Sequence, residues 1–124
     1  AGQYDSYEDF VRVLFINRFA LVKKHFPILK VFIQEIAFHS ELKEQYQKIF
    51  TNHVLEKFTE IIEHFQEKGE LIDIPPSSVI RMTMTSIVGF ILTRFLVIPE
   101  RDWDDELEIE QTIQFMMHGL RKKC

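Results

Sequence analysis

The chain has 124 residues, of which 46% are hydrophobic and 27% are charged, and its formal net charge is −4. A chain of this size buries about two-thirds of the surface of its unfolded form, so the composition is that of one globular domain and excludes a disordered segment. The acidic balance argues against direct binding of nucleic-acid backbones, because that binding needs clustered Lys and Arg. The one basic run, residues 121–123, suits the C-terminal end of a helix.

Cysteine content and hydropathy indicate where the protein resides. Cys124 is the only cysteine, so a disulfide within the chain is excluded. No signal-peptide pattern opens the sequence, and no uninterrupted apolar stretch reaches membrane-spanning length. The longest stretch, residues 87–98, is interrupted by Thr93 and Arg94. We therefore expect a soluble, cytoplasmic protein with no membrane association.

Two helices are expected in the first third of the chain. The first covers about residues 6–24 and is capped by Asp5 or Ser6. It is apolar on nearly every side, which predicts burial among several neighbours. Pro27 fits the first position of a second helix, over residues 27–38, because the N–H that proline lacks would be unpaired there anyway.

A longer third helix and a fourth helix follow. Ser40 is expected to cap the third helix, over residues 41–68, and Gly69 to end it. Its apolar residues keep a spacing of three and four for about seven turns. The turn over residues 69–76 contains two prolines and leads into the fourth helix, over residues 76–96.

The last helix is expected after an acidic turn that follows Pro99. It covers residues 105–122, and Asp104 is its expected cap. We find no strand pattern, internal repeat, low-complexity stretch or linker. The sequence therefore predicts an all-α fold in which residues 1–124 form a single domain, a bundle of about five main helices.

Several motifs occur in the order found in TetR-family transcriptional regulators. They are HFPILKVFIQEIAFHSELKEQYQKIF, the turn GELIDIPP, a helix carrying Ser86 and Gly89, the acidic start WDDELEIE and the end MMHGLRKK. The chain thus resembles the C-terminal effector-binding and dimerisation domain of this family from about residue 10 to residue 123. The N-terminal helix-turn-helix domain of the family has no counterpart here. We therefore expect DNA to be bound only through a domain that is missing from this chain.

The resemblance implies a homodimer. In this family the last two long helices of each subunit form a four-helix interface, which assigns residues 76–96 and 105–122 to self-association. Small residues permit a close crossing of helices, and Met adapts to an irregular partner surface. The residues assigned to this contact are Ser86, Gly89, Ile113, Met117 and Leu120. The alternative for each of them is a place in the core of its own chain.

The resemblance also implies an effector pocket enclosed by the remaining helices. The chain has twelve Phe, and many rigid rings pack imperfectly unless something fills the gaps, which favours a hydrophobic effector such as a fatty-acyl or aromatic compound. The assigned pocket combines apolar residues with a few polar groups for orientation. Its members are Phe15, Asn17, Phe19, Phe32, Ile36, Phe50, Val54, Phe58, Thr83 and Ile87. Taken singly, each Phe is more typical of a core.

The leading hypothesis is the ligand-binding and dimerisation domain of a TetR-like repressor. An effector would shift the population between two arrangements of the bundle and so change the spacing of the DNA-reading domains. An alternative from another class is a helical adaptor that docks a partner's helix. A third is a helical-bundle enzyme with a metal site.

Catalysis and metal binding are set aside on the spacing of the residues that would carry them. Glu35–His39 and Glu60–His64 each share a helix face, but a di-iron bundle needs paired Glu-x-x-His motifs, and the sequence has none. Such pairs are more typical of solvated helix faces. The sequence also lacks a nucleophile elbow, a phosphate-binding glycine loop and a CxxC motif. We therefore expect no catalytic residue, metal or cofactor.

Overall fold

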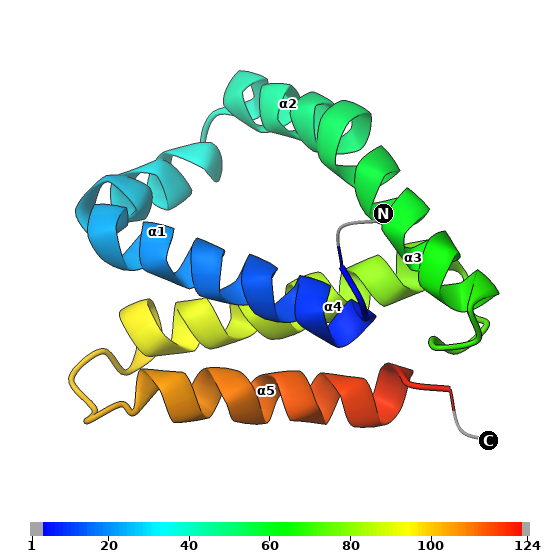
Figure 1. The fold of residues 1–124 in the computed structure, drawn as a ribbon. Coiled ribbons are helices and arrows are strands. Elements are labelled where there is room, and N and C mark those ends of the chain that lie inside the picture. Colours follow the sequence, from blue (N-terminus) through cyan, green and yellow to red (C-terminus); the bar gives the residue numbers. More distant parts are fainter. Residues whose placement is uncertain (1–3, 123–124) are drawn as a thin grey trace.

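A computed structural model describes residues 4–122, which fold into the all-α domain shown in Figure 1. Its helices are α1 (Tyr7–Ile36), α2 (Ser40–Ile49), α3 (Glu56–Glu67), α4 (Pro76–Leu92) and α5 (Asp105–Leu120). Two stretches of π-helix complete them: η1 (Phe50–Leu55) joins α2 to α3, and η2 (Thr93–Val97) extends α4. The all-α fold class predicted from the sequence is confirmed.

Three helix ends are fixed by local signals that the sequence shows. The Ser6 hydroxyl accepts a hydrogen bond from the Asp9 N–H at 3.0 Å and caps α1. The Asp104 carboxylate accepts one from the Leu107 N–H at 3.3 Å and caps α5. Gly69 follows α3 with a φ of 78°, a left-handed conformation that glycine adopts without a steric penalty.

The expected break between the first two helices is a kink within one helix. Helix α1 continues through Pro27, and only His25 has non-helical backbone angles, with φ −115° and ψ 23°. Pro27 has no N–H to donate to the carbonyl of Lys23, so the helix bends there without ending.

Other boundaries differ from the sequence-based expectations. Ser40 is the first residue of α2, and the cap position is taken by His39, whose side chain makes no capping hydrogen bond. The expected third helix changes to π-helical hydrogen bonding at η1. Helix α5 ends at Leu120, because Arg121 is extended and pairs with Leu71 in an isolated β-bridge.

Most of the core lies in a body made of the first half of α1 together with α3, α4 and α5. Helix α4 packs against all three of the others, and α5 lies beside α1 and α4 (Figure 1). The buried apolar residues are Tyr7, Phe10, Val11, Phe15, Phe19, Phe58, Ile62, Phe65, Leu71, Val79, Ile80, Ile87, Phe95, Ile109, Ile113, Met116, Met117 and Leu120.

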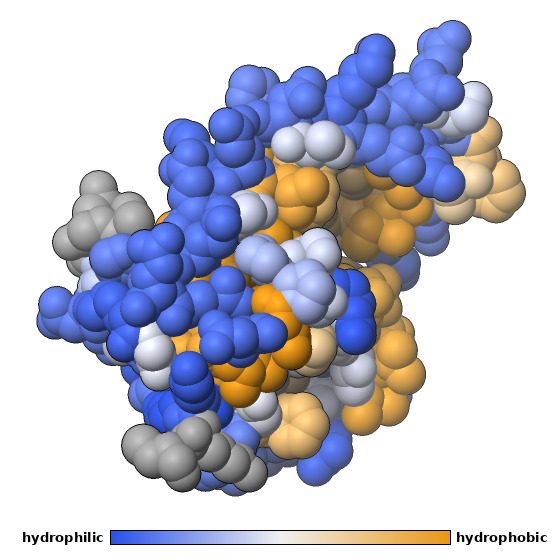
Figure 2. All heavy atoms as spheres, turned by 90° about the vertical axis from the view of Figure 1, so that its right-hand side faces the viewer, coloured by the Kyte–Doolittle hydropathy of each residue, from blue (hydrophilic) through white to orange (hydrophobic). Residues whose placement is uncertain are grey.

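The remaining part of the chain, residues 27–54, forms an arm that stands away from the body. It consists of the second half of α1, α2 and most of η1. No residue between Phe19 and Phe58 is buried. Figure 2 shows hydrophobic residues around a recess between the arm and the body. The arm therefore leaves uncovered much of the apolar surface that the sequence pattern assigns to helix packing.

A polar contact lies inside the body. The hydroxyl oxygens of Tyr7 and Thr83 are 2.8 Å apart, and both side chains are fully buried. Burial raises the pKa of the Tyr7 phenol above its ordinary value, so this group is neutral at physiological pH.

Substitution Thr83→Val should lower the free energy of unfolding by about 1–3 kcal/mol, because it leaves the buried Tyr7 hydroxyl without its partner. Urea denaturation followed by circular dichroism measures the change. Thr85→Val, on the exposed side of the same helix, is the matched control and should stay within about 0.5 kcal/mol of wild type. Adding Tyr7→Phe to Thr83→Val should recover part of the loss. Equal free energies of unfolding for Thr83→Val and Thr85→Val would contradict this account of the core.

Candidate functional site

The residues predicted to line a pocket fall into two groups in the structure. The first group lies in the filled core of the body, namely Phe15, Phe19, Phe58, Thr83 and Ile87. Their neighbours are other core side chains, as in the contact of Phe15 with Phe90, whose ring centroids are 5.7 Å apart. The only polar member, Thr83, is already hydrogen-bonded to Tyr7. This group belongs to the core of the chain itself.

The second group lies on the arm. Phe32 and Ile36 are half-buried on α1, whereas Phe50 and Val54 are exposed on η1. Asn17 belongs to neither group, because it is exposed on α1 before the kink. Of the apolar residues predicted to line the pocket, only those of the arm are therefore placed where a small molecule could reach them.

An open groove of about 540 Å³, which we call the arm groove, lies between the second half of α1 and the start of α2. Its lining is Pro27, Ile28, Val31, Phe32, Glu35 and Leu42. The rings of Phe32 and Tyr46 meet edge to face, with centroids 4.6 Å apart, so the two helices that border the groove touch across it.

The polar part of the arm groove is small. Glu35 is its one charged residue, and its carboxylate lies 2.8 Å from the His39 imidazole. The exposed fraction reaches 72% at Ile28 and 57% at Val31. The lining favours an uncharged, apolar occupant.

Exposed apolar residues also occur on α4 and α5, two helices that pack against each other. They are Val88 and Leu92 on α4 with Leu107 and Phe115 on α5, and we call them together the α4–α5 face. Phe115 is 78% exposed, an unusual position for a Phe in a helix that packs on a core. Sequence reasoning missed these residues. The available signal was that Phe115 lies outside the apolar stripe that α5 buries.

The residues predicted for a dimer contact lie at different depths. Ile113, Met117 and Leu120 are in the core of the chain itself and present no surface to a partner. Ser86 is half-buried and donates its hydroxyl to the Met82 carbonyl at 2.9 Å. Gly89 is exposed, and a Cβ atom added there would meet no atom within 4 Å. Of the five, Gly89 is the residue that borders the α4–α5 face.

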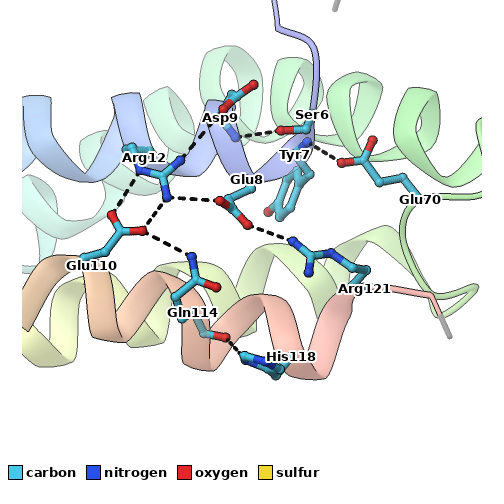
Figure 3. Close-up of polar contacts among 10 residues, drawn as sticks. All are labelled: Ser6, Tyr7, Glu8, Asp9, Arg12, Glu70, Glu110, Gln114, His118 and Arg121. Atoms are coloured by element: carbon cyan, nitrogen blue, oxygen red, sulfur yellow. Dashed lines mark hydrogen bonds and ion pairs between the residues drawn. The ribbon is translucent and has the colours of Figure 1, made fainter.

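Charged residues fix α1 against α5 (Figure 3). The Arg12 guanidinium donates to Glu110 at 2.6 Å and to Glu8 at 3.0 Å, and Arg121 donates to the other Glu8 oxygen at 2.7 Å. Hydrogen bonding to Arg12 lowers the pKa of the Glu110 carboxyl below its ordinary value. These contacts of Arg12, Glu8, Glu110 and Arg121 hold α1 against α5, and we call them the clamp.

In the part of the chain that the structure describes, no three His, Cys, Asp or Glu side chains gather in a way that could hold a metal ion.

Helix α4 is also apolar enough to raise the question of a membrane. Although no uninterrupted apolar stretch is that long, the helical run Pro76–Val97 passes a test of length and composition for a membrane span. This is weak evidence, because the core helix of a water-soluble protein passes the same test. A third of the tested stretch (33%) is buried within the chain, and the remainder includes the exposed Val88 and Leu92.

Comparisons with known proteins identify no relative: no protein-family model, no curated protein and no solved structure matches the chain.

Substitution Arg12→Gln should raise the pKa of the Glu110 carboxyl towards its ordinary value, because the group that stabilises the carboxylate is removed. A carboxyl-detected NMR titration measures this pKa. Since the pKa is lowered in the folded state, the contribution of Glu110 to stability is present above its unfolded pKa and is lost as the pH falls. Arg18→Gln, at an exposed position of the same helix, should leave the titration unchanged. An unchanged Glu110 pKa in Arg12→Gln would contradict the assignment of the clamp.

Proposed function

We propose that this chain is the effector-binding and dimerisation domain of a TetR-like transcriptional repressor that senses a hydrophobic small molecule. The observation that carries the proposal is the arm groove, an apolar recess with a single carboxylate, bordered by α2 and by the second half of α1, which bury no residue. Exposed apolar surface in water is unfavourable, and an apolar occupant would remove it from water.

The α4–α5 face supports the dimer part of the proposal. Apolar side chains on two neighbouring helices remain exposed although the core beneath them is complete. Two copies packed through this face would form the four-helix interface that the resemblance implies. Gly89 beside it leaves room for a close approach of a second helix.

The proposed mechanism is a shift between two arrangements of the same helices. An occupant of the arm groove would favour one packing of the second half of α1 against α2, and α1 continues from the arm directly into the body and its contacts with α4 and α5. A difference of about 1–3 kcal/mol between the two arrangements is typical of allosteric coupling. DNA recognition would reside in a domain outside residues 1–124.

A helical adaptor is the second candidate. The observation that favours it is the exposed side chain of Phe115, because a large aromatic residue standing on a helix surface is typical of an anchor for a partner protein. The oligomeric state separates the two candidates, since the repressor requires a homodimer through the α4–α5 face.

The effector part of the proposal is tested with the neutral fluorescent probe N-phenyl-naphthylamine. We expect the wild-type chain to bind it with a rise in fluorescence, and Val31→Asp to bind it about tenfold more weakly, a change of about 1.4 kcal/mol, because a carboxylate would enter the apolar arm groove. Ile16→Asp is the matched control, since Ile16 is also an exposed apolar residue of α1 but lies before the kink. Equal binding by both variants would contradict an effector site in the groove.

The dimer part is tested by sedimentation velocity. Gly89→Leu should raise the dimer dissociation constant by about tenfold or more, because the added side chain separates the two helices at the contact. Gly89→Ala should leave the dimer intact. Both variants should fold, since Gly89 is exposed and a Cβ atom added there meets no neighbouring atom within 4 Å. A wild-type monomer, or an intact dimer in Gly89→Leu, would contradict the assigned face.

A further inference from the structure

The arm joins the body through two segments with irregular helical geometry. On one side α1 is kinked at His25, two residues before Pro27. On the other side the chain passes through η1, a six-residue π-helical stretch between α2 and α3. Short π-helical stretches inside α-helices are rare, occur often at functional sites and are among the places where long helices bend.

The arm itself is held together. The Phe32 and Tyr46 rings join α1 to α2 across the groove, and the Glu35 carboxylate meets the His39 ring at 2.8 Å. In the turn between the two helices, the Glu35 carbonyl accepts the N–H groups of Phe38 at 3.0 Å and of His39 at 3.1 Å. Contacts of this kind on both sides of the turn keep the two helices of the arm in a fixed orientation relative to each other.

The arm contacts the body at the kink and just beyond it, where Leu29 and Ile33 lie near residues 91–96 of α4 and η2. Phe95 on η2 packs against Phe19 before the kink and against Phe26 after it, with ring centroids 5.4 Å apart in both pairs. Beyond this point no arm residue is buried. Figure 1 shows the same arrangement, with the end of α1 and the whole of α2 rising away from α4. Phe95 therefore lies where a pivot would be.

We infer that residues 27–54 are a hinged arm, which rotates as one unit relative to the body about His25 on one side and η1 on the other. Rotation towards the body covers apolar side chains on the side of the arm that faces α4 and η2, such as Leu29 and Ile33, and rotation away exposes them. The two hinges act together because the arm is attached to the body at both of its ends.

The hinge is tested by double electron–electron resonance on spin-labelled chain without any ligand. One label replaces Lys43 on the arm and the other replaces Gln111 on α5, both at exposed positions, in a chain that carries Cys124→Ser. The control pair is Glu63 on α3 with Gln111, two exposed positions within the body. The labelled chain is mixed with an excess of unlabelled chain, so that a dimer rarely carries labels on both of its subunits.

We expect a clearly broader distribution of distances for the arm–body pair than for the control pair. Pro27→Ala restores a backbone N–H next to the kink and should narrow the arm–body distribution, whereas Pro99→Ala, in the loop after η2, should leave it unchanged. An arm–body distribution as narrow as the control would overturn the inference. A broad distribution that Pro27→Ala does not change would overturn the hinge at His25.

The hinge and the effector site are tested separately. If N-phenyl-naphthylamine does not bind, the proposed effector fails, and the width of the arm–body distribution measured without ligand still decides the hinge.

Discussion

The contact on which the arrangement of this molecule depends is a series of aromatic rings between α1 and the α4–η2 helix. Phe15 and Phe19 pack against Phe90, and Phe19 and Phe26 pack against Phe95, with ring centroids 5.4–5.9 Å apart. Such ring pairs add to the stabilisation that comes from burying their area. The series fixes the first half of α1 across α4, and the other helices of the body pack around that crossing. It also ends where α1 bends.

The bend divides the chain into two parts with different environments. Before it, one side of α1 packs against α3, α4 and α5 and is buried. After it, α1 packs against α2 on one side and against α4 and η2 on another, and this partial cover buries none of its residues. The apolar side chains of the arm therefore remain accessible, and the arm groove follows from this geometry. The same reasoning applies to the α4–α5 face, where α5 buries one side and leaves Phe115 on the other.

The sequence predicted features that depend on near neighbours along the chain. The caps at Ser6 and Asp104 and the helix end at Gly69 are local, and the structure has all three. The kink was harder to predict, because a proline can begin a helix as well as bend one, and packing beyond Pro27 decides between the two.

The site was predicted less completely than the fold. Phe15 and Phe32 are the same residue type at helical spacing, yet one lies in the core and the other borders the arm groove. Their different positions depend on which helices pack against each part of α1, and this long-range information is absent from local periodicity. For the same reason, Ile113 was assigned to a dimer contact although it lies in the core of its own chain, and Phe115 was overlooked.

A native mass spectrum of the purified chain tests the central claim most directly, because it reports the dimer and the bound molecule together. The account predicts a dimer near twice 14.9 kDa that carries the added mass of an apolar small molecule. A monomer without a bound molecule would contradict the account, because the α4–α5 face would then lack its second subunit and the arm groove its small molecule.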